Sequence, residues 1–336
     1  MRVCLIGAFS GNPDEGYKNI ARHLADYLSR DHELMEVENR HLISAGIWKE
    51  MKTFSPDIIH YITAPTQSSF FVLKTAQKIC GGDVKTVISA LHPRSHDLFS
   101  NSFTRRYVQS LKPDLILTQC REIENNFTSA GCKTSRLPNG VDTLRFTPRN
   151  QEDRIRMRES LGIDEEKYVI LHVGHITRAR GIGILRDLQN ADRDHQVVIV
   201  GSSYFKPDHT LWNDLKQSGC LILNTYFRHI EEIYGLADCY VFPTPPANSI
   251  FMPLSVLEAM SCNIPVVSTP FQGLTDHFSE GEGLRFFTEP VDLIRHIEEY
   301  QQGVRDTGIR EKVLPIDWSV IGRRLEGEYH KVAQEC

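Results

Sequence analysis

Short apolar runs of strand type recur along the chain, and most are followed by a polar loop and a segment of helical periodicity. The run Arg2–Gly7 comes first, followed by the loop Ala8–Gly16 and by a helical pattern from Tyr17 to Ser29. Apolar residues recur at every fourth position from Ile20 to Leu28, which gives this helix one face to bury. A strand, a loop that carries glycine and a helix form the opening unit of a doubly wound α/β domain, with a ligand crevice at the loop.

The same alternation continues through the rest of the chain. Later strand patterns are Asp57–Ile62, Thr86–Leu91, Asp114–Thr118, Tyr168–Val173, Gln196–Gly201, Leu221–Asn224, Asp238–Pro243 and Ile264–Ser268. Helical patterns are Arg121–Ala130, Ile230–Ala237, Leu254–Met260 and Val291–Gly303, and a last helix opens at 316–319 and runs through Tyr329. The charged stretch Asn150–Lys167 predicts a linker with a short solvated helix. We therefore expect two α/β domains.

The composition argues against several classes of protein and partner. The 336 residues are 40% apolar and 24% charged, which is typical of a globular protein of about two domains. The net charge of −5 gives no electrostatic reason to expect a nucleic-acid partner. No apolar run approaches the ~18 residues that a membrane helix needs, and no signal-peptide pattern follows Met1. The eight cysteines contain no Cys-x-x-Cys pair, so we expect reduced thiols in a cytoplasmic protein.

The stretch Ser249–Gly273 carries the first candidate chemistry. Pro253 precedes Leu254 at a predicted helix start, where a fixed φ and a missing N–H do no harm. The backbone N–H groups of Leu254 and Ser255 would have no partner inside the helix, and such a terminus attracts anions. Glu258, one turn further on, could accept two hydrogen bonds from a ribose diol. The alternative is an ordinary helix whose Glu258 is solvated.

A second candidate is the loop 174–181 (GHITRARG), which follows the strand pattern Tyr168–Val173. Arg180 offers a bidentate fork suited to phosphate. His175 would be partly charged near neutral pH, and its neutral ring would still donate one hydrogen bond. The alternative for Arg178 and Arg180 is a solvated, charged loop.

The third candidate is His92, which directly follows the strand pattern Thr86–Leu91, with His96 as the alternative. A histidine at the carboxyl end of a parallel strand lies where open α/β sheets bind their ligands. The same residue could equally be structural.

Three segments of the chain resemble signatures of one enzyme family, the retaining family 4 glycosyltransferases (group 1) of the GT-B fold. Residues 136–148 contain its Pro-Asn-Gly-Val-Asp and Phe-x-Pro elements. Residues 174–181 resemble Gly-Arg-x-x-x-x-Lys-Gly, with His175 in place of the arginine and Arg180 in place of the lysine. Residues 238–273 resemble the segment that contains the family's Glu-x7-Glu motif and the strand after it.

The chain departs from this last motif at one position. Glu258 matches the second glutamate, but the first falls at Ile250, which is not acidic. In the family the first glutamate holds sugar hydroxyls. Its absence therefore bears on sugar recognition and on activity itself.

The resemblance implies a GT-B fold, in which two Rossmann-like doubly wound domains face each other across a cleft. The first, acceptor-side domain is expected at 1–148, with a C-terminal helix at 318–336 that crosses back to it. The donor domain is expected at 165–317, and a linker at 149–164.

The resemblance also implies an activity, that of a hexosyltransferase. A sugar would pass from a nucleotide-diphosphate sugar, UDP-sugar in preference to GDP-sugar, to a glycan, lipid or small-molecule acceptor, with retained anomeric configuration. No cofactor and no metal are expected. His92 would face the reacting sugar, and Gly16 would approach an acceptor or donor phosphate. Gly174, Arg180 and His175 would clamp the donor diphosphate.

Two other classes of function stay open, and so does a contact with a membrane. A nucleotide-sugar-binding pseudoenzyme is suggested by Ile250 together with His175. An epimerase or phosphorylase could use the same scaffold. The segment Phe99–Leu111, with Arg105 and Arg106 beside apolar residues, leaves open a peripheral contact at the inner face of a membrane, where lipid-linked acceptors would lie.

Overall fold

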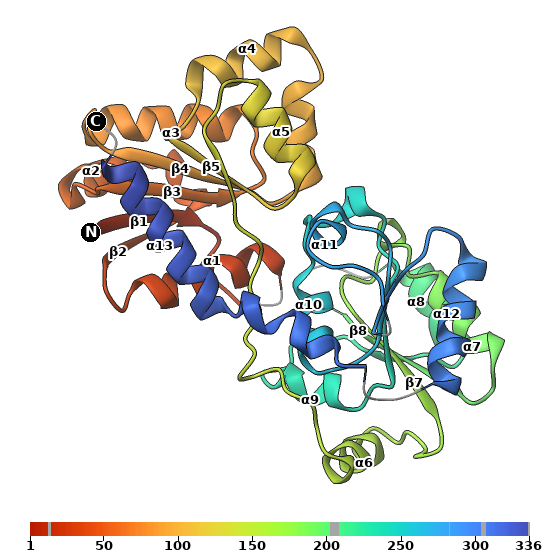
Figure 1. Cartoon of the computed structure of the whole chain (residues 1–336). Coiled ribbons are helices and arrows are strands. Elements are labelled where there is room, and N and C mark those ends of the chain that lie inside the picture. The colour runs from red at the N-terminus through yellow and green to blue at the C-terminus, as the bar shows by residue number, and fades with distance from the viewer. Residues whose placement is uncertain (13–14, 202–207, 282, 304–306, 335–336) are drawn as a thin grey trace. The chain divides into compact units, whose positions relative to one another are not determined.

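The computed structural model describes residues 1–12, 15–201, 208–281, 283–303 and 307–334 (Figure 1). The chain divides into two compact units. The first unit comprises Met1–Gly140, Ile250–Met252 and Trp318–Cys336, and the second comprises Val141–Ser249 and Pro253–Asp317. Residues 149–164, predicted as a linker, fall within the second unit. Of the predicted loop Ala8–Gly16, residues 13 and 14 lie outside the described residues.

The first unit contains a six-stranded parallel sheet in the order β2-β1-β3-β4-β5-β6. Its strands are β1 (Arg2–Gly7), β2 (Glu33–Glu38), β3 (Ile58–Thr63), β4 (Lys85–Ala90), β5 (Leu115–Thr118) and β6 (Thr134–Arg136). Its helices are α1 (Gly16–Leu28), α2 (Ala45–Phe54), α3 (Gln67–Cys80), α4 (Ser102–Leu111), α5 (Arg121–Ser129) and α13 (Trp318–Gln334), with short 3-10 turns at η1 (Asn39–Ile43) and η2 (Pro93–Phe99). All the strand pairs are parallel, as the strand–loop–helix alternation predicted.

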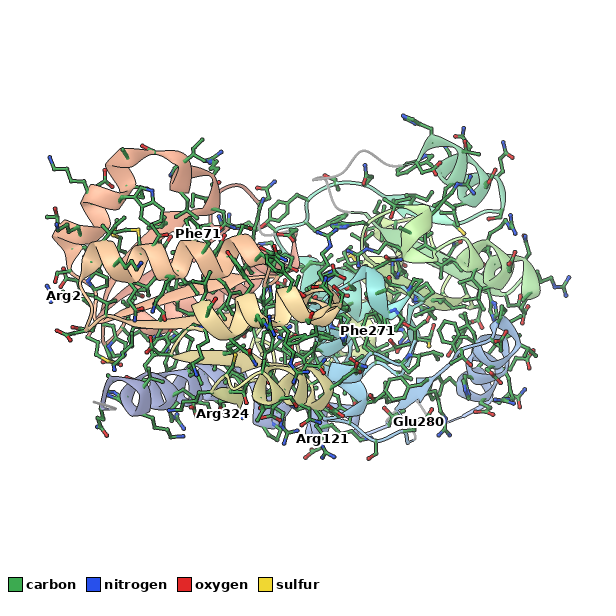
Figure 2. All side chains as sticks on the ribbon, turned by 90° about the horizontal axis from the view of Figure 1, so that it is seen from above. Arg2, Phe71, Arg121, Phe271, Glu280 and Arg324 are labelled. Carbon is green, nitrogen blue, oxygen red and sulfur yellow. The ribbon has the colours of Figure 1, made fainter. Side chains whose placement is uncertain are left out.

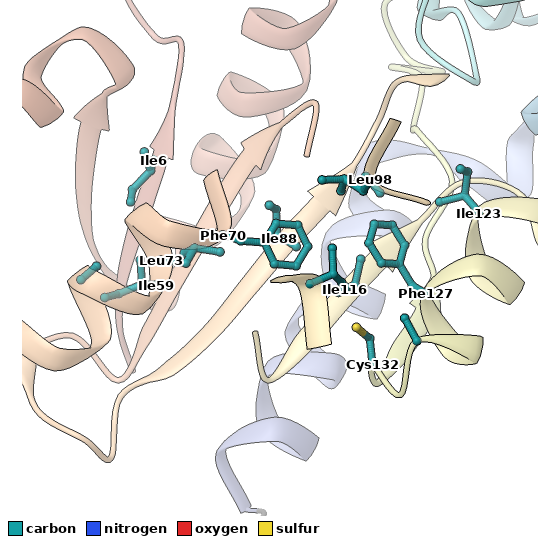
Figure 3. Packing of buried hydrophobic residues seen from close by; sticks show 14 of the residues in the cluster. Ile6, Ile59, Phe70, Leu73, Ile88, Leu98, Ile116, Ile123, Phe127 and Cys132 are labelled. Atoms are coloured by element: carbon teal, nitrogen blue, oxygen red, sulfur yellow. The ribbon is translucent and has the colours of Figure 1, made fainter. Parts of the chain in front are cut away.

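The core of the first unit lies between this sheet and its helices. Residues Val3 to Ile6 are fully buried, because a parallel strand covered on both faces needs a continuous apolar run. Phe70 of α3 and Phe127 of α5 stack with ring centroids 6.2 Å apart, among the buried residues shown in Figure 3. Helices α3 and α4 pack against each other, and the Tyr107 hydroxyl donates to the Gln67 carbonyl at 3.1 Å.

Helix α13 returns to the first unit, as predicted, and histidines hold it there. His60 of β3 is buried between Tyr329 Oη, 2.6 Å from its Nδ1, and Ser89 Oγ, 2.8 Å from its Nε2. Burial lowers the pKa of His60 to about 3, so this ring is neutral. His23 stacks on Trp318 at 4.8 Å, and His32 lies 3.0 Å from Glu326. The end of the chain is therefore part of the first unit's core.

The second unit contains another six-stranded parallel sheet, in the order β12-β11-β10-β7-β8-β9. Its strands are β7 (Tyr168–Val173), β8 (His195–Val200), β9 (Leu221–Leu223), β10 (Cys239–Phe242), β11 (Val266–Ser268) and β12 (Leu284–Phe286). Its helices are α6 (Gln151–Ser160), α7 (Ile184–Ala191), α8 (His209–Gln217), α9 (Ile230–Gly235), α10 (Leu254–Ser261), α11 (Gln272–Thr275) and α12 (Pro290–Gln302). Shorter 3-10 turns are η3 (Arg178–Arg180), η4 (Pro246–Asn248), η5 (Ile309–Lys312) and η6 (Leu314–Ile316).

Ion pairs connect helix α6 to Asp238, which directly precedes β10. Arg158 is 3% exposed, and its guanidinium donates to Asp238 at 2.6 Å and to the Leu236 carbonyl at 2.9 Å. Arg154 pairs with the same carboxylate, which also accepts the Val169 N–H at 2.8 Å. The expectation of a solvated helix is therefore wrong at Arg158, because this arginine serves as a buried partner of Asp238.

No helix among the described residues combines the length and the apolar composition that crossing a membrane requires.

Candidate functional site

The strand order of the second unit places a crevice at one position. From β7 the order runs to β8 and β9 on one side and to β10, β11 and β12 on the other. In open α/β sheets, ligands bind at the carboxyl ends of the strands where the order reverses in this way. Gly174 and His175 follow β7 at this point, and Pro243 and Thr244 follow β10. The predicted loop 174–181 therefore begins at the switch point.

Gly174 leaves the strand directly against a buried histidine. Its N–H donates to the Val200 carbonyl at 3.0 Å, and a Cβ at this position would lie 3.0 Å from His172 Nε2. His172 is fully buried, and its Nδ1 donates to the Val241 carbonyl at 2.9 Å. Burial lowers the pKa of His172 to about 4, so the ring is neutral. The close fit explains why residue 174 has no side chain.

Arg180 and His175 form a pair within this loop. Arg180 Nη2 lies 3.2 Å from His175 Nδ1, and both side chains are half-buried. A guanidinium only donates hydrogen bonds, so His175 Nδ1 accepts and the ring is neutral, with its proton on Nε2. Gly181 then turns the chain at φ 68°, where a Cβ would lie 2.6 Å from the Pro243 carbonyl oxygen. The loop thus packs on the end of β10.

Helix α10 begins at Leu254, directly after Pro253, as the sequence predicted. No side chain caps its N-terminus, and among the described residues neither the Leu254 nor the Ser255 amide donates to a backbone carbonyl outside the helix. The amides of Leu254 and Ser255 therefore have no hydrogen-bond partner among the described residues.

Tyr240 connects this helix start to the loop 174–181. Its hydroxyl donates to the Val173 carbonyl at 3.2 Å, and the Ser255 side chain lies close enough to lower the pKa of Tyr240. The pKa of Tyr240 is raised above its usual value by burial, against the smaller effect of the nearby positive charge of Arg180. One phenol thus hydrogen-bonds the end of β7 and lies within electrostatic reach of Ser255 in the first turn of α10 and of Arg180.

Glu258 lies one turn into α10 and is half-buried. Tyr234 of α9 donates its hydroxyl to Glu258 Oε2 at 2.7 Å and to the Ser255 carbonyl at 3.3 Å. Burial raises the pKa of Glu258 to about 7, and the hydrogen bond from Tyr234 is the largest influence in the opposite direction. The alternative of a fully solvated Glu258 is therefore wrong.

The remaining predicted site residues, Gly16 and His92, belong to the first unit. Gly16 is the first residue of α1, and a Cβ there would lie 3.4 Å from Ile250 Cδ1. His92 Nδ1 accepts the Arg94 N–H at 3.1 Å and so caps η2. His96, the alternative, lies 3.5 Å from Glu122. His92 thus has a structural role, and the role toward the reacting sugar that the resemblance implies stays a prediction.

Two tyrosines that complete the second unit's arrangement, Tyr234 and Tyr240, were missed by the sequence analysis. Each lies in an apolar segment where a buried ring is expected, and no local signal marks its hydroxyl. Among the described residues, no three His, Cys, Asp or Glu side chains are grouped closely enough to hold a metal ion.

Comparison with known proteins gives a family match for part of the second unit. Residues 167–302 match the family model described as "Glycosyl transferases group 1". The chain is 25% identical over 322 residues to the sulfoquinovosyl transferase SQD2 of Arabidopsis thaliana, covering 87% of this chain and 60% of that protein. It is also 25% identical over 310 residues to the putative teichuronic acid biosynthesis glycosyltransferase TuaC of Bacillus subtilis, covering 87% and 75%.

A solved structure extends the likeness to the whole fold. The Anabaena protein HepE in complex with UDP-glucose superposes with a TM-score of 0.75 at 18% identity, covering 98% of this chain and all of that one. The predicted GT-B fold, with two Rossmann-like doubly wound domains, is confirmed. The chain spans 60% of the length of the Arabidopsis relative and 75% of the Bacillus one.

Proposed function

We propose that the protein is a retaining glycosyltransferase that moves a sugar from a nucleotide-diphosphate sugar, with UDP as the preferred nucleotide. The observation that carries this proposal is the uncapped N-terminus of α10, connected by Tyr240 to the loop that holds Arg180. The match of residues 167–302 to the group 1 family model and the UDP-glucose bound to HepE support it.

In the proposed mechanism the second unit binds the leaving diphosphate. Its oxygens lie on the amides of Leu254 and Ser255, with the guanidinium of Arg180 against them. Negative charge builds on this group as the bond to the sugar breaks, and donors that are already in place stabilise it without reorganising. The acceptor attacks from the face of the leaving group, so retention needs no aspartate nucleophile. The helix terminus and Arg180 supply the positive charge, and the proposal includes no metal.

His175 acts as a neutral donor in this proposal. Because its Nδ1 accepts from Arg180 at 3.2 Å, its remaining N–H is on Nε2 and can donate to the diphosphate. The hydrogen bond also restricts the rotamers of Arg180. The charged form of His175, which the sequence left open, would carry a proton on Nδ1 and lose this hydrogen bond.

Glu258 holds the ribose in this proposal. Its carboxylate accepts two hydrogen bonds from the diol while Tyr234 donates to Oε2 and fixes the side chain. One helix thus binds diphosphate at its first turn and ribose one turn later. His92 and Gly16 of the first unit are proposed to serve the reacting sugar and the acceptor.

We further propose a lipid-linked acceptor, reached at an anionic membrane surface. Helices α3 and α4 contain Lys74, Lys78, Arg105 and Arg106 but no acidic residue, in a chain of net charge −5. Phe71 on α3 is 59% exposed (Figure 2), and Phe103 on α4 is 73% exposed. Basic residues beside exposed aromatic rings favour an anionic lipid surface.

The clamp assigned to Arg180 predicts a loss of transfer in Arg180→Ala. A hydrogen bond from a charged group contributes about 1.5–3 kcal/mol, so the rate of sugar transfer should fall about 10- to 100-fold. Arg178→Ala is the matched control, because Arg178 is in the same turn but its side chain is 62% exposed and pairs with Asp208. Steady-state rates with UDP-sugars and GDP-sugars measure both. Equal rates in the two variants would contradict the clamp.

The role of Glu258 predicts a pH dependence of nucleotide binding. Since the pKa of the free carboxyl is about 7, protonation below that pH removes the acceptor of the ribose hydrogen bonds. The Kd for UDP should therefore rise, approaching tenfold per pH unit below about pH 7. Glu258→Gln should bind weakly and lack this dependence, and the phosphate titration of UDP cancels between the two proteins. Parallel pH profiles by calorimetry would contradict the assignment.

The membrane proposal predicts binding to vesicles of phosphatidylglycerol and not of phosphatidylcholine. Phe103→Ser should lower the partition coefficient about tenfold, because burying a phenylalanine contributes about 1.5–3 kcal/mol. Leu144→Ser, at an 89% exposed residue of the second unit, is the matched control. Co-sedimentation equal for the two variants would reject this surface.

The same assays separate the rival functions. Nucleotide binding without transfer to any acceptor would identify a binding protein, a candidate favoured by Ile250, which is only 6% exposed and apolar at the position of the first motif glutamate. A product formed without an acceptor would identify an epimerase, and phosphate dependence would identify a phosphorylase.

A further inference from the structure

The tripeptide Ile250–Met252 belongs to the first unit, although the helix that follows it in the chain belongs to the second. Its residues are 6%, 2% and 0% exposed. The Phe251 N–H donates to the Leu91 carbonyl at 3.0 Å, and the Phe251 ring meets the His96 ring edge-on at 6.2 Å. The chain therefore enters α10 from a segment that the first unit holds firmly.

Asn139 holds the carbonyl group of Met252, the last residue of this tripeptide. Its Nδ2 donates to the Met252 carbonyl oxygen at 2.7 Å, and its Oδ1 accepts from Gln119 Nε2. A carbonyl only accepts, so the amide of Asn139 has one possible orientation. Asn139 and Gln119 are 2% and 1% exposed, and a buried amide between two partners resists rotation.

The two ends of the Gln119 side-chain amide differ in their hydrogen bonding. Its Oε1 is buried and has no hydrogen-bond partner among the described residues. An unsatisfied buried acceptor costs about 1–3 kcal/mol, and most buried polar groups in proteins avoid this cost. The chain tolerates it here while the other end of Gln119 holds Asn139.

A short covalent path leads from the Met252 carbonyl to the first amide of α10. The peptide group between Met252 and Pro253 is planar, and the proline ring fixes φ, which is −62° here. Only ψ of Pro253, at 127°, remains free to rotate between the held carbonyl and the Leu254 N–H. The orientation of one carbonyl therefore sets the direction of the first amide to within a single torsion.

We propose that Asn139 is a positioning residue for the donor diphosphate, acting through Met252 and Pro253 on the first turn of α10. This inference rests on the proposed function, because it assigns the amides of Leu254 and Ser255 to the diphosphate. Asn139 itself does not touch the nucleotide. It holds the backbone donors in the direction that the phosphate oxygens require, so that binding does not have to order them.

The test compares Asn139→Leu with Tyr329→Phe. The leucine has a similar volume but cannot donate to the Met252 carbonyl. Tyr329→Phe removes a buried hydrogen bond in the same unit, to His60, far along the chain from residues 250–254. Both variants should unfold at a lower temperature. Only Asn139→Leu should raise the Kd for UDP, by about tenfold, while the Kd for uridine, which has no phosphate, stays within about twofold of the native value.

The calorimetry tests the proposed function and this inference separately. If the native chain binds neither UDP nor GDP, the proposed function fails and this inference falls with it. If the native chain binds and the two variants have equal Kd values for the diphosphate, the inference alone is overturned. An equal rise in Kd for UDP and uridine would also overturn it, since it would show a general structural defect.

Pro253→Ala keeps the inference testable if Asn139→Leu does not fold. Alanine accepts the same φ and adds no bulk, but it frees the second torsion of the path. The ratio of the Kd for uridine to the Kd for UDP should fall by about three- to tenfold. An unchanged ratio would count against positioning through this path.

Discussion

The free N-terminus of α10 is the feature on which the site of the second unit depends. A helix start leaves N–H groups that need partners, and proteins usually supply a side-chain cap. Here the residue before the helix is Pro253, which has no side-chain acceptor, and no side chain of the described residues replaces it. The same terminus carries the positive end of the helix dipole. An anion that binds there satisfies the donors and the dipole together.

The residues around this terminus are held by hydrogen bonds and packing contacts that do not involve the amides of Leu254 and Ser255. Tyr234 donates to the Ser255 carbonyl and Tyr240 to the Val173 carbonyl, so the N–H of Ser255 takes part in neither hydrogen bond. Gly181 allows the loop of Arg180 to pack within contact distance of the Pro243 carbonyl, and His175 restricts the arginine. The binding groups are therefore arranged by contacts that a ligand need not break, which is the condition for preorganised electrostatic stabilisation.

Much of this could be predicted from the sequence, because the signals are local. The strand patterns, the start of α10 at Leu254 and the sequence of the loop 174–181 each depend on neighbouring residues. Three strands were missed for a physical reason. All three are edge strands that include polar residues: β6 reads TSR, β12 reads LRF and β2 reads ELMEVE. Such short or half-exposed strands lack the continuous apolar run that marks a buried parallel strand.

The rest could not be predicted because it depends on residues that meet only after folding. Tyr234 reaches Glu258 across 24 residues and Asn139 reaches Met252 across 113. Arg158, which looked like one charge in a solvated run, is buried against Asp238, 80 residues later. Hydroxyl and amide partners have no periodicity, so the sequence marks the helix that binds an anion but not the side chains that orient it.

The most direct measurement of the central claim compares two variants of Leu254, of which one keeps the backbone amide hydrogen and the other lacks it. Leu254→Pro deletes the first N–H of α10, at a position where proline suits both the helix start and the extended Pro253 before it. Leu254→Ala keeps the N–H and loses the same side chain. By calorimetry with UDP or GDP, we expect Leu254→Pro to bind about tenfold more weakly than Leu254→Ala. Equal affinities would contradict the claim that this helix terminus holds the diphosphate.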